Sequence, residues 1–117
     1  MIEELVSRVF AIRNAAHLAH WASQSYSEHK ALGKFYDGVI DKIDAIIETY
    51  QGWYGLIGEV RITVVTKGGI TDKIREELAW IAKHRDQIAK KNTMIENLLD
   101  DLMQLYSVTH YMLVNLK

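Results

Sequence analysis

The chain contains no cysteine, so it can form no disulfide, no thiolate metal site and no cysteine nucleophile. Any metal ion would therefore bind to histidine and carboxylate side chains. The chain also contains no proline, and five of its seven glycines lie between residues 52 and 69. Helix-breaking residues are thus concentrated in one short stretch, which predicts a mostly helical protein.

Long apolar runs and an excess of charge of either sign are also missing. No segment approaches the roughly 20 apolar residues of a membrane span, and the N-terminus lacks the basic and then apolar order of a signal peptide. Fourteen basic and fifteen acidic residues give a net charge of −1, with no basic tail. We therefore expect no strong nucleic-acid binding and no membrane partner. The expected location is cytoplasmic, in the host cytoplasm if a phage encodes the protein.

What the chain does contain is enough apolar sequence for one core. Its 117 residues are 49% hydrophobic and 25% charged, which is typical of an ordinary globular protein. This length supports one substantial core but not two. The prediction is a single domain over residues 1–117.

Apolar residues recur at helical spacing in four stretches of the chain. They predict helices over residues 2 to about 22, from the Ser25 region to just before Gly52, from Thr71 through Ile88, and from about residue 94 almost to the C-terminus. Capping-box patterns that begin at Ser25 and Thr93, and a cap at Thr71, predict where the last three helices start.

The glycine-rich stretch at about residues 52–70 connects the second and third helices. Its Arg61–Thr66 core is rich in β-branched residues, which predicts extended chain. About 18 extended residues reach roughly 55–60 Å, whereas a 25-residue helix spans only about 37 Å. An up-down-up-down bundle would need only a short loop here. The prediction is therefore an all-α, ferritin-like four-helix bundle with one long crossover between helices 2 and 3.

Three histidines gather around the first hairpin. His20 falls in the last turn of the first helix and His29 in the first turn of the second, so the hairpin brings both to one end of the bundle. Two imidazoles there can share one metal ion. His17, at the edge of the apolar face, is a further candidate ligand. The alternative is that His20 is a hydrogen-bonded core histidine and the other two are surface residues.

Asp44 and Glu48 form a pair of carboxylates one helical turn apart, which suits a hard or borderline cation. The alternative is a solvated helix face. Asp44 lies fifteen residues beyond His29, about 22 Å along the helix, so the two cannot bind one ion within a chain. A shared site would combine His20 and His29 of one subunit with Asp44 and Glu48 of another.

The Ala16–Trp21 segment, the later His29 and the Asp44–Glu48 pair resemble the Dps family of mini-ferritins. The whole chain is also similar to small, uncharacterised phage-borne proteins related to Dps. The resemblance implies a ferritin-like homo-oligomer, from a dimer up to a dodecameric shell, with an intersubunit ferroxidase centre that oxidises and sequesters iron. Zn or another divalent metal is the alternative ion. The implied ligands are His20, His29, Asp44 and Glu48, with His17 as the alternative to His20.

Two other functions fit the same residues. Four residues after His29, where Dps proteins carry an acidic ligand, this chain has Gly33. This departure favours a nonenzymatic helical assembly or binding protein, associated with a phage, that keeps the bundle without metal chemistry. Arg13 and His20 also match the Arg-x(4–6)-His pattern of HEPN-like RNases, although that pattern is short and common.

Overall fold

The computed structural model describes residues 1–63 and 68–117, and within these ranges the chain is helical with no strand. The four helices are α1 (Ile2–Ala22), α2 (Tyr26–Tyr54), α3 (Ile70–Ala89) and α4 (Thr93–Asn115). The predicted all-α class and the number of helices are therefore confirmed for the described residues. None of these helices is both long and apolar enough to cross a membrane.

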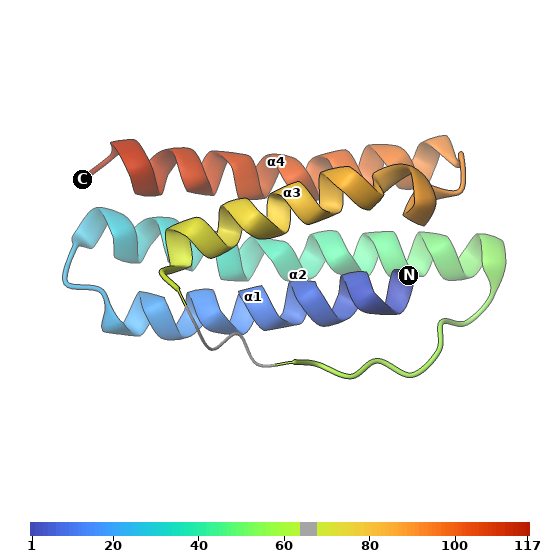
Figure 1. Ribbon diagram of the computed structural model, residues 1–117, viewed down its shortest axis with the longest axis horizontal. Helices are drawn as coiled ribbons and strands as arrows, with labels where there is room; N and C mark the ends of the chain where they lie inside the picture. The colour runs from blue at the N-terminus through green and yellow to red at the C-terminus, as the bar shows by residue number, and fades with distance from the viewer. Residues whose placement is uncertain (64–67) are drawn as a thin grey trace.

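The helices form a four-helix bundle that measures 44 × 25 × 21 Å. α1 packs against α2 and α3, and α4 packs against the same two helices, so α1 and α4 lie on one diagonal and α2 and α3 on the other. Figure 1 shows that α1 and α2 form one antiparallel hairpin and that α3 and α4 form the second. In this view α2 and α3 run in the same direction.

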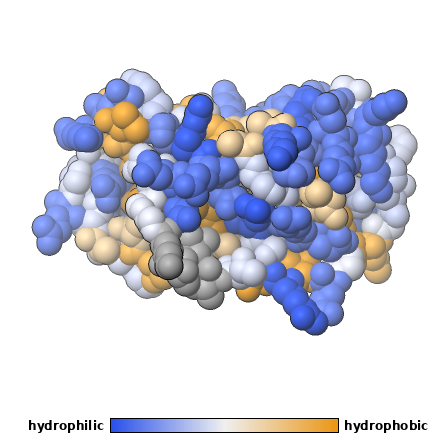
Figure 2. Space-filling view, in the orientation of Figure 1, coloured by the Kyte–Doolittle hydropathy of each residue, from blue (hydrophilic) through white to orange (hydrophobic). Residues whose placement is uncertain are grey.

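One apolar stripe from each helix faces the centre of the bundle, as helical periodicity requires. Leu5, Leu32, Ile81 and Leu99 come from the four different helices and are at most 1% exposed. Phe35 and Tyr106 meet edge to face at the centre, with their ring centroids 5.0 Å apart. Hydrophilic side chains cover most of the face in Figure 2, with smaller apolar areas between them.

The first hairpin forms as predicted, but α2 is longer than expected. Ser25 caps α2, and its side chain accepts a hydrogen bond from the Glu28 backbone N–H at 3.3 Å. The helix does not stop before Gly52; it continues to Tyr54. A single glycine costs a helix only about 1 kcal/mol, so α2 ends instead at Gly55, where φ is 91°. The connector between α2 and α3 is therefore residues 55–69, shorter than the predicted 52–70.

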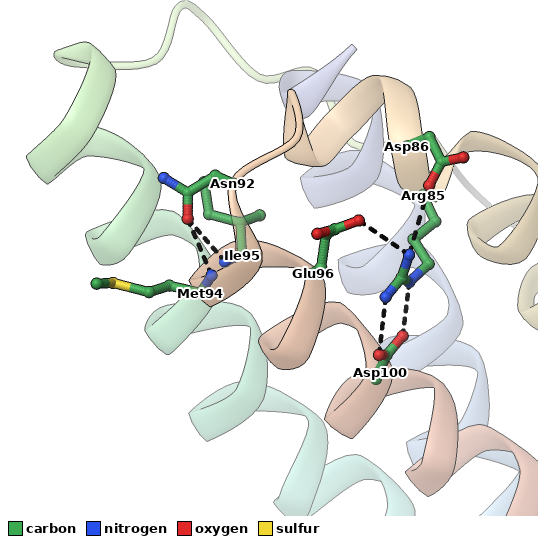
Figure 3. A network of polar contacts seen from close by, with 7 residues as sticks. All are labelled: Arg85, Asp86, Asn92, Met94, Ile95, Glu96 and Asp100. Carbon is green, nitrogen blue, oxygen red and sulfur yellow. Dashed lines mark hydrogen bonds and ion pairs between the residues drawn. The ribbon is translucent and has the colours of Figure 1, made fainter.

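The predicted caps of the last two helices were wrong. α3 begins at Ile70, so Thr71 lies inside the helix and Gly69 precedes it. α4 is capped by Asn92 and not by Thr93, because the Asn92 side-chain oxygen accepts from the backbone N–H groups of Met94 and Ile95 at 3.0 and 3.2 Å (Figure 3). Asparagine is among the strongest N-cap residues, and it stands one position earlier than Thr93.

The described part of the connector lies along α1. The Gly58 backbone N–H donates to Glu3 Oε2 at 2.9 Å, and Ser7 Oγ donates to the Arg61 carbonyl oxygen at 2.6 Å. The bond from Gly58 also lowers the pKa of the Glu3 carboxyl. Residues 61–63 form no helix, and the remainder of the predicted extended Arg61–Thr66 segment lies outside the described residues.

Arg85 joins α3 to α4 beside their connecting turn (Figure 3). Its guanidinium donates to both carboxylate oxygens of Asp100, at 2.7 and 2.9 Å, and to Glu96 at 3.2 Å. These contacts raise the pKa of Arg85 and lower the pKa of Asp100. This bidentate ion pair fixes the orientation of α3 relative to α4 more strictly than a single hydrogen bond would.

A double-mutant cycle with Arg85→Gln and Asp100→Asn should give a coupling energy of up to about 1 kcal/mol at pH 7, since the pair is partly exposed. The lowered Asp100 pKa adds stability above the ordinary carboxyl range, and this contribution is lost as the pH falls through the folded-state value. Urea unfolding at pH 7 and in acid measures both quantities. A coupling energy that stays constant into acid would contradict the assignment.

Candidate metal site

His20 and His29 form a reciprocal pair at the closed end of the α1–α2 hairpin. His20 Nδ1 lies 2.6 Å from the His29 carbonyl oxygen, and His29 Nδ1 lies 2.8 Å from the His20 carbonyl oxygen. The two rings stack with centroids 3.6 Å apart and planes 18° from parallel. Both side chains are half-buried. The prediction that the hairpin brings these two histidines together is confirmed.

These two hydrogen bonds determine which nitrogen of each ring carries the proton. A carbonyl oxygen only accepts, so Nδ1 of both rings must be the donor. In the neutral imidazoles, Nε2 then keeps its lone pair, which is the form that binds a metal ion. Histidine ligands commonly donate their other ring N–H to a backbone carbonyl in this way. The pair is thus already in the tautomer that ligation requires.

The position of the pair follows from the geometry of the helix ends. The His20 carbonyl belongs to the last turn of α1, where carbonyl groups have no partner within the helix. His29 Nδ1 supplies that partner. The His29 carbonyl points along α2 toward the next turn, and the His20 ring that reaches it lies over Gly33.

Gly33 provides the space for the His20 ring. A Cβ atom at this position would lie 3.2 Å from His20 Cε1, tighter than most Cβ contacts, and 3.4 Å from His20 Nδ1. The sequence suggested only that a carboxylate ligand is missing here. The structure adds a packing reason for glycine, because a Cβ atom here would require the hydrogen-bonded ring to move by a few tenths of an ångström.

His17 belongs to a second aromatic group on the same hairpin. Its ring stacks on Tyr36, with centroids 3.9 Å apart and planes 11° from parallel, and lies 4.6 Å from Trp21. The centroid of its ring is 6.4 Å from that of His20. His17 is therefore close to the histidine pair but is not part of it. Trp21 is 69% exposed, so it is not a core residue.

Asp44 and Glu48 lie on the outward face of α2, and both are exposed. Among the described residues, no group of three or more histidine and carboxylate side chains could hold a metal ion. The structure thus brings His20 and His29 together but does not bring Asp44 and Glu48 to them within one chain. His29 and the two carboxylates lie on one continuous helix, α2, so the rise of the helix keeps them apart.

Tyr36 and Arg13 complete the surroundings of the histidines. Arg13 Cζ lies 5.3 Å from the centre of the Tyr36 ring, and the ring also meets His20 edge to face at 5.2 Å. The sequence did not single out Tyr36, since it lies within the apolar pattern of α2. The available signal was its spacing, because it follows His29 by seven residues and so shares its side of the helix.

Gly33→Ala and Gly52→Ala make a matched pair of helical substitutions in α2. Gly52 has open space around its Cβ position, so Gly52→Ala should raise the free energy of unfolding by about 0.5–1 kcal/mol. Gly33→Ala should give no such gain, because its methyl group displaces the His20 ring. Urea unfolding measures the free energies, and ¹⁵N NMR of the imidazoles reports the tautomers. An equal gain at both positions, with unchanged histidine signals, would contradict this role of Gly33.

Comparison with known proteins gives a family without an assigned activity. No curated protein and no solved structure matches the chain. Residues 20–113 match the Family of unknown function (DUF5856), and this range includes His20, His29, Asp44 and Glu48 but not His17. Because the match spans most of its length, the chain belongs to the DUF5856 family.

Proposed function

We propose that this protein is a Dps-like metal-binding protein that takes up Fe(II) at a site shared between two subunits. The observation that carries the proposal is the reciprocal hydrogen bonding of His20 and His29, which leaves Nε2 of both neutral rings as a free electron-pair donor.

The two outward carboxylates support a shared site. Asp44 and Glu48 make no ion pair or side-chain hydrogen bond with any residue that the structure describes. They lie too far along α2 to reach the histidines of their own chain. A second subunit with its α2 antiparallel to the first would bring each carboxylate pair to the other chain's histidine pair, twice per dimer.

The topology of the bundle also supports a ferritin-like fold. We assign the chain a ferritin-like arrangement, in which the described part of the connector returns along α1 and the two hairpins are joined so that α2 and α3 are parallel. The contacts of Gly58 and Arg61 with α1 support this path for the connector. In ferritin-like proteins, metal sites are formed by side chains of facing helices.

The donor set suits iron chemistry. Two imidazole nitrogens and two carboxylates form a mixed nitrogen and oxygen environment that binds Fe(II), and also Zn(II), well. The carboxylates neutralise the ion and favour the ferric product. Oxidation would transfer one electron from each Fe(II) to dioxygen or peroxide, and the Fe(III) product would be released or stored. His17, one turn from the pair, is the alternative nitrogen ligand.

A second candidate function is a nonenzymatic assembly protein, which Gly33 favours. Without the carboxylate that Dps proteins carry at this position, the site has one oxygen ligand fewer. The same dimer could then persist for assembly alone. Metal binding separates the two functions, because the assembly protein would form the same oligomer with or without a divalent ion.

Titration with Fe(II) under anaerobic conditions, and with Zn(II) as a redox-silent probe, should give about one or two ions per chain. His20→Ala, His29→Ala and the double variant Asp44→Asn/Glu48→Gln should each weaken binding at least about tenfold. His110→Ala, which removes a histidine on α4, is the control and should bind like the wild type. Isothermal titration calorimetry measures the affinities, and absorbance of Fe(III) after admission of air measures oxidation.

Binding by the wild type no tighter than by the His20→Ala/His29→Ala double variant would overturn the metal proposal. Zn(II) binding without any Fe(II) oxidation would retain the site and remove the ferroxidase reaction. The HEPN-like alternative is tested with the same variants and Arg13→Ala in an RNA cleavage assay, where we expect no activity.

A further inference from the structure

A pocket of about 350 Å³ opens between the N-terminal part of α2 and the C-terminal end of α4. Figure 1 shows both segments at the end of the bundle where the α1–α2 hairpin closes. The lining combines a hydroxyl group, two ammonium groups and an apolar side: Ser27, Lys30, Ala31, Lys34, Met112 and Leu116. Sites for small molecules usually have volumes of about 300–1,000 Å³. The pocket is therefore large enough for a small ligand.

The two lysines of this pocket have no acidic partner among the residues that the structure describes. Lys30 and Lys34 are exposed and lie one turn apart, so their side chains are neighbours on the same side of α2. Lys30 Nζ lies 5.8 Å from the ring of Tyr26, which has no charge that could neutralise it. An anion bound between the two ammonium groups would relieve their mutual repulsion.

The surroundings of the pocket also favour an anion. No aspartate or glutamate occurs between residues 102 and 117, the part of the chain that forms the α4 side. Glu28 and Asp37 flank the two lysines in the sequence, but neither forms an ion pair with them. Ser27 Oγ lies 3.0 Å from Ser25 Oγ, and when Ser25 is the donor, the Ser27 hydroxyl proton is free to bind a ligand.

The other side of the pocket is apolar. Ala31 is only 3% exposed, and Met112 is half-buried. Leu116, in contrast, is 47% exposed, so its own chain leaves much of this apolar side chain in water. An alkyl group placed against Met112 and Leu116 would remove this surface from water, which is favourable.

We propose that this pocket binds a small amphipathic anion, a medium-chain fatty acid, with its carboxylate between Lys30 and Lys34 and its alkyl chain against Met112 and Leu116. A wholly polar anion would leave the apolar side of the pocket in water. A neutral apolar molecule would leave both lysines without a counter-charge. A ligand with a charged head and an apolar chain complements both sides of the pocket at once.

A groove of about 450 Å³ between α3 and α4 provides an internal comparison. Its described lining is also largely apolar, with Ala82 and Met103 among its residues, but it contains one charged side chain, Arg75. Asp72 lies three residues before Arg75 on the same side of α3 and offsets part of its charge. We therefore expect a fatty acid to prefer the pocket between α2 and α4, where two lysines act together.

The fatty-acid site is separate from the candidate metal site. His29 lies next to Lys30 in the sequence, but its ring faces α1, where Nδ1 donates to the His20 carbonyl oxygen at 2.8 Å. The pocket opens on the α4 side of α2 instead. Fatty-acid binding thus needs neither the metal ion nor its ligands, and it can be measured with a chelator present.

Titration with octanoate in the presence of EDTA, followed by ¹H–¹⁵N NMR, tests the site. Octanoate should bind with a Kd of about 1 mM or lower and shift the amide signals of Ser27, Ala31 and Leu116. Butyrate has the same head with a shorter chain, and octyltrimethylammonium has the same chain with the opposite charge. Each should bind at least about tenfold more weakly, and added salt should raise the Kd of octanoate.

Lys30→Gln and Lys34→Gln should each raise the Kd of octanoate about threefold or more, because each removes one of the two charges that hold the carboxylate. Leu116→Ser should raise the Kd of octanoate but leave that of butyrate unchanged, since only the longer chain reaches the apolar side.

Lys83→Gln on α3 and Leu18→Ser on α1 are matched controls, because they make the same substitutions at exposed positions away from the pocket. Each should leave the Kd of octanoate unchanged, and circular dichroism verifies that every variant is folded.

Three results would overturn the proposal. One is the absence of any saturable shift up to about 10 mM octanoate. Another is a set of shifts confined to Ala82 and Met103, which would place the ligand between α3 and α4. The third is a Kd that Lys30→Gln/Lys34→Gln leaves unchanged. Loss of octanoate binding in this double variant, with the Zn(II) affinity of the wild type retained, would support a fatty-acid site that is independent of the metal site.

Discussion

Burial of one apolar stripe from each helix is the main interaction that stabilises this molecule. The chain has no disulfide that could add to it. Each fully buried leucine, isoleucine or phenylalanine contributes about 1.5–3 kcal/mol, and Leu5, Leu32, Phe35 and Leu99 all lie in this core. The same burial decides which residues face outward. Once Phe35 and Ile46 point to the centre of the bundle, the charged side of α2 must face away from it.

The hairpin end combines structural and chemical roles in the same atoms. His29 satisfies a carbonyl group at the end of α1, and His20 reaches a carbonyl group in the first turn of α2. These bonds join the two helices and determine the tautomer of both rings. Gly33 allows this approach because it has no Cβ atom. The residue that reduces the number of carboxylate ligands therefore also leaves room for the His20 ring.

Net charge conceals how charge is distributed over the bundle. The total is −1, yet Lys30 and Lys34 lie at one end of the outward face of α2 and four carboxylates occupy the rest of it. The opposing charges of Arg8 and Glu77, in contrast, are paired between α1 and α3. A nearly neutral chain can thus carry a strongly polarised face, and such faces favour one orientation of a partner over another.

Much of the fold was predictable from local patterns. Helical periodicity, an absence of proline and clustered glycines predicted four helices and the site of the long connector, since these features act over a few residues. The cap at Ser25 was correct, but those at Thr71 and Thr93 were wrong. Neighbouring residues compete for a cap, and at α4 Asn92 stands one position earlier than Thr93.

The sequence by itself therefore determined the helices, their apolar faces and the meeting of His20 with His29 at one end of a hairpin. Only the tertiary structure decided the reciprocal hydrogen bonds of that pair, the stacking of His17 on Tyr36 and the packing role of Gly33. The physical reason is that periodicity specifies which side of a helix a residue occupies. Ring orientation and the partner of each nitrogen depend on how two helices approach each other, which spacing along one chain does not specify.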